Sequence, residues 1–343
     1  MDAHTKHSLP NITLRPMSMG DLLDRAIYFY RTHFVALITY AALFVVPISV
    51  LSAFTSFAGP GMMLWNPNIL DSNPEIFGLS YFLSIAATFL LALASVVIFP
   101  LQVGGVGIAL YGFFLEERRV SLREMLTSVR EQFSPLLGTG ILGMLLSAIS
   151  LPFMIIPPVG LAIATLYGFA LYFAVFVVLY EKRTGLDALR RGWVLIRSSV
   201  RRALGYIFLF YVFSLLLGSI LGGLVGGAAF ATTILIENPA MILLAQTLAT
   251  MLTTLLFAPL QYAVAGLLYF DLRIRYEGLD VALAAAQAAG EPLDLAAAPI
   301  SNEPIRHHKT WRAIGILSAI YTCLLVVFCG CIAAFVFMAS AIG

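Results

Sequence analysis

Arginine side chains concentrate in one short stretch of the chain, where they could bind anionic groups. The stretch is residues 185–204, and its arginines are Arg190, Arg191, Arg197, Arg201 and Arg202. Apolar residues recur between them at helical spacing, which predicts an amphipathic helix that lies along a membrane surface. Such arginines could recognise anionic lipids specifically. Alternatively, they only orient the protein in the membrane, and their side chains extend toward headgroups of any kind. We expect orientation to account for most of this charge.

A proline and a glutamine recur together at two places within long uncharged runs. The two copies are Pro100-Leu101-Gln102 and Pro259-Leu260-Gln261. Each copy predicts a helix kink with an amide beside it, at matching depth in two spans, which is how a transport site could begin. Alternatively, the amide bonds to backbone groups that the proline frees. We favour this structural interpretation.

Residue patterns for catalysis or metal binding are missing from the sequence. None of the five histidines lies in a predicted span, and no span contains an Asp, Glu, Lys or Arg. Gly138 to Gly143 fits GxGxxG, but a dinucleotide site needs a preceding strand and a following acid. We interpret these glycines as positions of close helix packing. The sequence therefore predicts no catalytic residue, no metal, no other cofactor and no nucleic-acid partner.

The composition is that of a membrane protein. Hydrophobic residues make up 60% of the chain, charged residues make up 11%, and the mean hydropathy is +0.94. A soluble domain carries roughly 25% charged residues, so this chain has too little polar surface to cover a globule in water. We predict an all-α fold, a polytopic transmembrane helical bundle with about seven spans and three cytosolic interfacial amphipathic helices.

The elements that position these residues are spans and the short helices between them. Surface helices begin near Ser18, Ser121 and Gly185, and an acid follows each of the two serines after three residues, as in a capping box. We expect each surface helix to lead into two spans. The predicted spans are 34–54, 80–115, two within 134–180 joined at Pro157-Pro158, 203–233, 241–270 and 313–339. Whether 80–115 is one kinked helix or two segments stays open.

The chain divides into four parts on this interpretation. Residues 1–17 form a flexible tail, 18–282 a six-span domain, 283–310 a Pro/Ala-rich linker and 311–343 the seventh span. The three units of the six-span domain share spacing of apolar and basic residues, so an internal duplication stays open. Gly218, Gly222 and Gly226 form overlapping GxxxG patterns that could pack helices within the protein, in a homo-oligomer or against other membrane proteins.

The distribution of charge predicts the orientation. All 20 Lys and Arg fall on one predicted side, while the opposite loops carry only Asp71, Glu75 and Glu237. The positive-inside rule places the basic side in the cytosol. We therefore expect a multi-pass protein of the cell membrane with a cytosolic N-terminus and, after seven spans, an extracytoplasmic C-terminus.

Three segments resemble a bacterial family of polytopic membrane proteins. Residues 14–26, 188–193 and 269–280 are similar to the opening, the middle signature and the ending of the membrane domain of glycerophosphoryl diester phosphodiesterase. The resemblance covers roughly residues 14–282. It implies a six-span membrane module, and it does not bring the hydrolytic activity, because the chain after Asp280 cannot encode the catalytic barrel of those enzymes.

Three functions remain as hypotheses. The leading one is a non-catalytic membrane module, either a lipid-contacting scaffold or a partner for other membrane proteins. The alternative is a transporter of an uncharged or amphipathic solute that uses the kinks at Pro100 and Pro259. The third is a lipid-modifying enzyme, which would need cytosolic groups such as Asp271, Glu277 and His307 to converge.

Overall fold

The computed structural model describes most of the chain as helices. The described residues are 16–58, 74–198, 202–206, 223, 239–289, 295–298, 300 and 311–326. Within them there is no strand, which confirms the predicted all-α fold. The fifth predicted span and the Gly218, Gly222 and Gly226 pattern lie almost wholly outside the described residues, with only Gly223 and the first turn described.

The first unit begins as the capping pattern predicts. Helix α1 (Met19–Thr32) starts after Ser18, whose side chain accepts a hydrogen bond from the Asp21 backbone while Asp21 bonds back to Ser18. Helix α2 (Phe34–Ala58) follows after one residue. The predicted loop at 55–79 is shorter than expected, because α2 continues to Ala58 and α5 begins at Pro74.

Two helices are much longer than a single span. Helix α5 (Pro74–Phe114) has 41 residues and helix α11 (Pro239–Glu277) has 39. At ~1.5 Å per residue each is close to twice as long as a ~30 Å hydrocarbon core requires. The open question about 80–115 is thereby answered as one continuous helix with Pro100 inside it. The sixth predicted span ended at Phe270, which is too early, because α11 carries on through the charged residues to Glu277.

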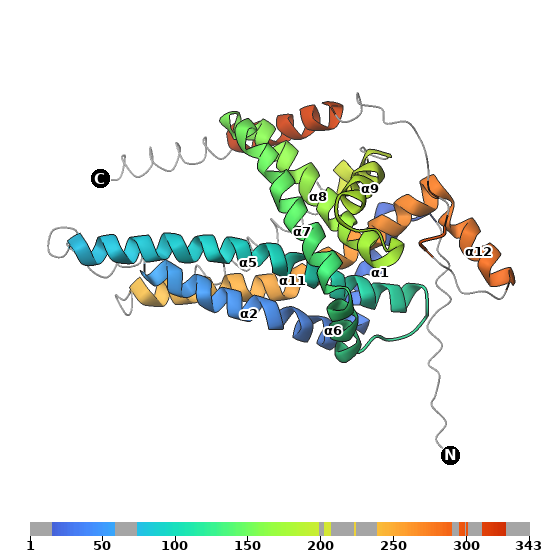
Figure 1. Cartoon of the computed structure of the whole chain (residues 1–343), viewed down its shortest axis with the longest axis horizontal. Helices are drawn as coiled ribbons and strands as arrows, with labels where there is room; N and C mark the ends of the chain where they lie inside the picture. The colour runs from blue at the N-terminus through green and yellow to red at the C-terminus, as the bar shows by residue number, and fades with distance from the viewer. Residues whose placement is uncertain are drawn as a thin grey trace, which may run out of the picture.

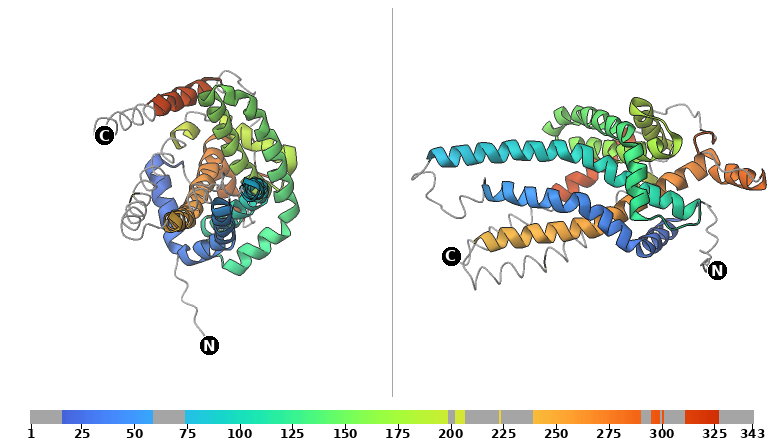
Figure 2. Two further views of the ribbon diagram at one scale, coloured as in Figure 1. Left: turned by 90° about the vertical axis from the view of Figure 1, so that its left-hand side faces the viewer. Right: turned by 60° about the horizontal axis from the view of Figure 1, so that its bottom comes forward.

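The middle unit is a helical hairpin between two surface helices. Helix α6 (Leu122–Glu131) is capped by Ser121, as predicted, and α7 (Phe133–Ser147) leads through a 3-10 segment, η1 (Ala148–Ile155), into α8 (Pro157–Glu181). The turn falls at Ile156, directly before the predicted Pro157-Pro158. Helix α9 (Gly185–Ser198) then folds back against α8. Figure 1 shows this hairpin inclined to α2, α5 and α11, which lie side by side (Figures 1 and 2).

Both long helices change character at their prolines. Before Pro100, α5 carries exposed apolar side chains from Leu79 to Leu93, whereas almost every apolar side chain from Val103 to Phe114 is buried. On α11, every fourth residue from Leu244 to Leu256 is an exposed leucine, and the residues from Ala258 to Ile274 are mostly buried. We call the two exposed segments, with residues 45–56 of α2, the outer half. Its apolar surface needs lipid or further protein to cover it.

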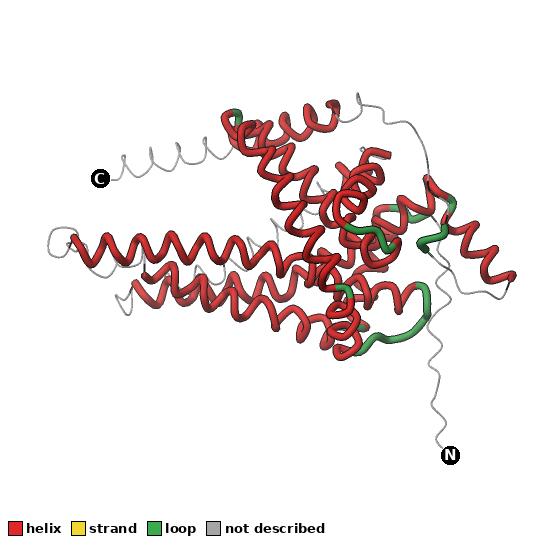
Figure 3. Tube along the Cα trace, in the orientation of Figure 1, coloured by secondary structure: helices red, strands yellow, loops and turns green. Residues whose placement is uncertain are grey.

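The buried segments of α5 and α11 meet the surface helices at the other end of the molecule. There they pack with α1, α6, α9 and residues 170–181 of α8 into one hydrophobic core. Figure 3, in the orientation of Figure 1, shows the helices gathered at that end. We call this part the ionic end, because the buried charges lie in it. Glu181, Asp271 and Arg273, which follow predicted spans, are therefore inside the protein, whereas Arg118 and Arg119 after α5 are exposed.

The last described segments also contact the bundle. Helix α12 (Leu279–Ala289) extends into the region predicted as a linker, and Leu295 and Ala298 of the same region are buried. Residues Trp311–Val326 form an apolar helix within the predicted seventh span. Its Ala313 and Leu317 pack against Ala162 and Leu166 of α8.

Five described helices are long and apolar enough to cross a membrane. They are Phe34–Ser56, Gly78–Phe114, Phe133–Ile155, Pro157–Glu181 and Leu244–Glu277. The fold is thus an all-α bundle suited to a lipid bilayer, and five of the seven predicted spans have described counterparts of sufficient length.

Candidate functional site

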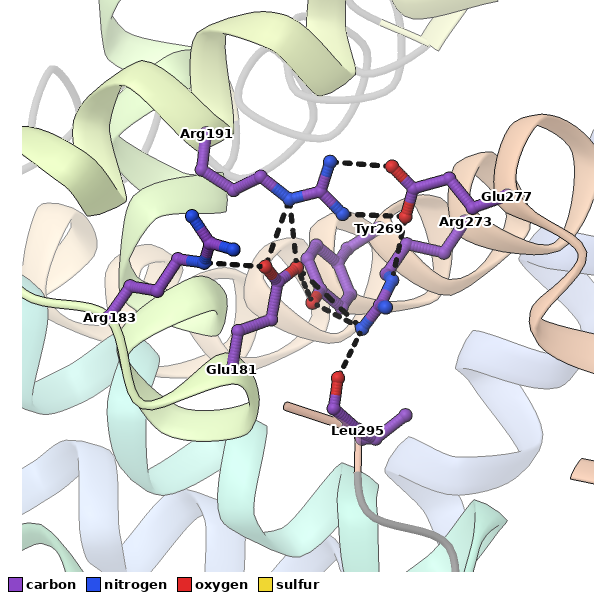
Figure 4. Close-up of polar contacts among 7 residues, drawn as sticks. All are labelled: Glu181, Arg183, Arg191, Tyr269, Arg273, Glu277 and Leu295. Carbon is purple, nitrogen blue, oxygen red and sulfur yellow. Dashed lines mark hydrogen bonds and ion pairs between the residues drawn. The ribbon is translucent and has the colours of Figure 1, made fainter. Parts of the chain in front are cut away.

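Four charged side chains form a buried cluster where α8, α9 and α11 meet (Figure 4). The Arg191 guanidinium donates to both carboxylate oxygens of Glu181, at 2.9 and 3.2 Å, and to both oxygens of Glu277, at 2.5 Å each. Arg273 donates from Nε to Glu277 at 3.0 Å, and its Nη1 lies 3.6 Å from Glu181. The side chains of all four are at most 4% exposed. Two carboxylates and two guanidinium groups balance one another.

Further groups bond to this cluster, although Arg273 Nη2 is buried without a partner among the described residues. The Tyr269 hydroxyl donates to Glu181 at 2.8 Å, and Arg273 donates to the Tyr269 oxygen and to the Leu295 backbone carbonyl. Arg183, which is half exposed, reaches Glu181 from the surface at 3.6 Å. A buried ion pair of this kind is tolerated because each charge has several partners. Burial opposes the charged form of Arg191, but Glu277 and Glu181 overcome that effect and raise its pKa above the ordinary value.

A second group of contacts joins the start of α1 to α11. The buried Asp271 carboxylate accepts a hydrogen bond from the Met17 backbone N–H at 2.8 Å and pairs with Arg275 at 3.0 Å. Arg202 lies 3.5 Å from the same carboxylate. Arg202 and Arg275 both also donate to the Met17 carbonyl. The chain before α1 is thus held between two arginines and an aspartate that come from distant parts of the sequence.

Helical spacing and one close helix contact assemble both groups. Tyr269, Arg273 and Glu277 are four residues apart and share a face of α11, while Asp271 and Arg275 share another face. On α9, Gly192 lies so close to α8 that an added Cβ would be 2.6 Å from the Ala170 carbonyl oxygen. This approach of α9 to α8 brings Arg191 to Glu181.

The structure gives the five predicted arginines different surroundings. Arg190 is exposed, whereas Arg191, the next residue, is enclosed in the four-charge cluster. Arg202 is engaged with Asp271 and Met17. In Arg197 two guanidinium nitrogens are buried without a partner among the described residues. Arg201 lies outside the described residues. The expected arrangement, with arginine side chains extended toward headgroups, fits Arg190 and does not describe Arg191.

The tyrosine that follows the second Pro-Leu-Gln copy bonds to the glutamine of the first, and the second glutamine bonds to a tyrosine of α8. Tyr262 donates to the Gln102 amide oxygen at 2.8 Å, and the Gln261 amide nitrogen donates to the Tyr172 hydroxyl at 2.9 Å. The expectation that these amides bond to freed backbone does not hold. Near Pro100, the Tyr40 hydroxyl donates to the Leu101 carbonyl at 2.6 Å, whereas the carbonyl that Pro100 leaves without its helical N–H partner is that of Val96. In the glycine motif, Gly140 packs on Pro100 and Gly143 packs on Leu171, as predicted, but an added Cβ at Gly138 would meet nothing within 4 Å.

A cleft of about 480 Å³ opens in the outer half, between α2, α5 and α11. Gln102 lies in its wall, but Gln261 does not. The remaining described lining residues are apolar or carry uncharged polar groups: Val45, Ile48, Ser49, Ser52, Ser56, Ser95, Ile98, Phe99, Gln246, Thr247, Thr250 and Thr254. A transport site was expected to bring both glutamines to one polar cavity, and only Gln102 lies in this one.

The groups that an enzyme would need are distributed between the two clusters. Asp271 pairs with Arg275 and Arg202, while Glu277 pairs with Arg191 and Arg273. His307 lies outside the described residues. Among the described residues no three His, Cys, Asp or Glu side chains come close enough to hold a metal ion.

Sequence reasoning missed the buried cluster, although a signal was present. Glu181 and residues 271–275 directly follow the predicted spans that end at residues 180 and 270, where charges are expected at a membrane boundary. The i, i+4, i+8 spacing of Tyr269, Arg273 and Glu277 would have placed three interacting groups on one helix face. Their partners, Glu181 and Arg191, come from other helices, and no local pattern predicts that contact.

Comparison of the chain with protein-family models, curated proteins and solved structures finds no match. The functional argument therefore depends on the contacts described above.

Proposed function

We propose that this chain is a non-catalytic, multi-pass module of the cell membrane that acts as a scaffold contacting anionic lipid. The observation that carries the proposal is the pairing of charges at the ionic end. The buried carboxylates of Glu181, Glu277 and Asp271 are all occupied by arginines of the same chain. A general acid or base must exchange a proton with a substrate. These carboxylates instead bond to arginines and join helices.

The same contacts make the ionic end a rigid platform. The four-charge cluster links α8, α9 and α11, and Asp271 links α11 to Met17 and Arg202. All three units of the bundle are thereby connected at one end. Removing one partner from such a pair leaves an uncompensated buried charge and costs roughly 3–5 kcal/mol, so the arrangement strongly favours a single geometry.

Exposed arginines surround this platform. Arg31 of α1, Arg123 and Arg130 of α6 and Arg190 of α9 are all exposed, and each lies on a short amphipathic helix. A basic residue near an anionic membrane surface contributes about 1 kcal/mol to lipid attraction. We place these four arginines at the cytosolic leaflet, in agreement with the positive-inside rule.

The three segments that resemble the phosphodiesterase membrane domain meet at the ionic end. Met17 belongs to the first, Arg191 to the second, and Asp271, Arg273 and Glu277 to the third. Their convergence supports the proposal that the resemblance reflects a shared membrane module, in which the short segments serve to join helices.

Substitution of exposed and buried arginines tests the proposal directly in nanodiscs that contain anionic lipid. We expect the triple change Arg123→Gln, Arg130→Gln and Arg190→Gln to lower retention of anionic lipid in native mass spectrometry by about five-fold per residue. The matched variant Arg191→Gln should instead lower thermal stability and affect lipid retention only through unfolding. Unchanged lipid retention in the triple variant, with the fold intact, would refute the proposal.

A further inference from the structure

The outer half carries a cleft whose walls are polar but uncharged. Its 480 Å³ volume lies within the range of small-molecule sites. The described lining residues include no Asp, Glu, Lys, Arg or His. A charged solute would lose its hydration there without gaining a counter-charge, which is costly in an apolar setting. The cleft is therefore suited to a neutral molecule.

Hydrogen bonds within the helices determine which groups the cleft offers. Four hydroxyls in the wall donate to backbone carbonyls of their own helix: Ser56 to Ser52, Ser95 to Ala92, Thr250 to Gln246 and Thr254 to Thr250. A hydroxyl that donates to backbone keeps its oxygen lone pairs free. These four side chains accordingly present hydrogen-bond acceptors, and a ligand must supply the donors.

Gln102 adds a donor at the inner end of the cleft. Its amide oxygen accepts a hydrogen bond from the Tyr262 hydroxyl, so its N–H groups are the part of the amide that can donate to a ligand. Val45, Ile48, Ile98 and Phe99 supply apolar wall beside these polar groups. The site combines several acceptors, the amide groups of Gln102 and Gln246, and an apolar surface.

We infer that the cleft between α2, α5 and α11 binds an uncharged amphiphile that bears hydroxyl groups. Its hydroxyls donate to the serine and threonine oxygens and accept from Gln102, and its apolar part packs on Ile48, Ile98 and Phe99. The opening of the cleft on helices that suit a bilayer favours a molecule that arrives from the membrane over a water-soluble polyol. This inference does not depend on the lipid-contacting role of the exposed arginines.

Photolabelling of the full chain in nanodiscs tests this inference. The probe is monooleoylglycerol with a diazirine in its acyl chain, and the comparison probe is the same molecule with a phosphate on its glycerol. We expect the neutral probe to label residues 45–56, 95–102 and 246–254 at least five-fold more than the anionic probe. Unlabelled monooleoylglycerol should compete, and free glycerol at the same concentration should not.

Substitutions then distinguish a site from general contact with lipid. Gln102→Leu and Thr250→Val each remove one hydrogen-bonding group, and a loss of about five-fold in labelling corresponds to one such bond. Thr250 is exposed, so Thr250→Val tests the site even if Gln102→Leu does not fold. Thr322→Val is the matched control, because Thr322 also donates to its own helix, at Ser318, but lies outside the cleft.

Three results would overturn the inference. Equal or stronger labelling of the cleft by the anionic probe would contradict a preference for neutral molecules. Competition by free glycerol would assign the cleft to a soluble polyol. Labelling that responds equally to Thr250→Val and Thr322→Val would show that the probe only samples exposed helix surface.

Discussion

The ionic end and the outer half handle polar groups in opposite ways. At the ionic end, four charged side chains are buried and paired with one another, as in the contacts of Arg191 with Glu181 and Glu277. In the outer half the polar groups are uncharged, belong mainly to serine and threonine, and border an open cleft. The boundary between the two parts falls near Pro100 and Pro259, within continuous helices.

This difference shows how one helix can serve two purposes. Charges in apolar surroundings are tolerated only when they are matched, so the ionic end carries charge that joins α8, α9 and α11. Serine and threonine satisfy their own donors within a helix at little cost, so the outer half carries polarity without needing a partner. The first arrangement favours rigidity, and the second leaves acceptors free for a ligand.

Loss of Arg273 should have the largest effect of any single change at the ionic end. Arg273→Met removes a fully buried cation that contacts Glu181, Glu277, Tyr269 and Leu295, and it leaves two carboxylates with one buried arginine. We expect a loss of roughly 3–5 kcal/mol in the free energy of unfolding in detergent micelles. Arg31→Met, at an exposed position, is the control. A loss below about 1 kcal/mol for Arg273→Met would contradict the role of the cluster.

Gly192 tests the helix contact that brings the cluster together. In Gly192→Ala the new methyl group would meet the backbone of Ala170 and Ala174, which cannot rotate away. We expect destabilisation of about 1–3 kcal/mol, measured by thermal unfolding. Gly138→Ala is the matched control, because an added Cβ there meets nothing within 4 Å. The control should be neutral or stabilising, since alanine favours a helix more than glycine. Equal stability of the two variants would show that α9 can shift without loss.

A substitution at the boundary between the ionic end and the outer half should lower the free energy of unfolding less than the two changes above. Tyr262→Phe removes the hydroxyl that donates to Gln102 and leaves the ring in place. We expect a loss of about 1 kcal/mol in the free energy of unfolding. The double variant with Gln102→Leu should cost little more than Gln102→Leu alone, because both changes remove the same bond. Full additivity in equilibrium unfolding would contradict this pairing.

The smallest effect is expected at the surface pair of Arg118 and Glu124. The Arg118 hydrogen bond lowers the pKa of Glu124, so the pair contributes stability above the unfolded value of about 4.3 and loses it as pH falls through the lower folded value. Both side chains are more than a third exposed, so we expect less than about 1 kcal/mol, reduced further by salt. Unfolding midpoints of the native chain and Glu124→Gln, compared between pH 7 and pH 3, check this. A difference that grows toward low pH would contradict the assignment.

Local patterns in the sequence predict the elements well and their contacts poorly. The caps at Ser18 and Ser121 and the turn before Pro157 all follow from neighbouring residues. The positions of Arg190 and Arg191 do not, because adjacent residues on a surface helix point in different directions and only packing decides which one is enclosed.

The ends of the long helices were misjudged for a related reason. Asp271, Arg273 and Arg275 resemble a charged boundary, and a boundary normally ends a span. Here the helix continues, since each of these charges finds an oppositely charged partner. The cleft was anticipated only in part: Gln102 lines it, while Gln261 bonds to Tyr172. Hydroxyl groups on α2 and α11 form the rest, and their convergence depends on how these helices pack.

The central claim is that the buried charges at the ionic end stabilise one another, and a double-mutant cycle on Arg191 and Glu277 tests it most directly. Arg191→Met and Glu277→Met each leave an unbalanced buried charge, whereas the double variant leaves the matched pair of Glu181 and Arg273. We predict that the double variant is more stable than the sum of the single effects by about 2 kcal/mol in equilibrium unfolding. Additivity within about 0.5 kcal/mol would contradict the account.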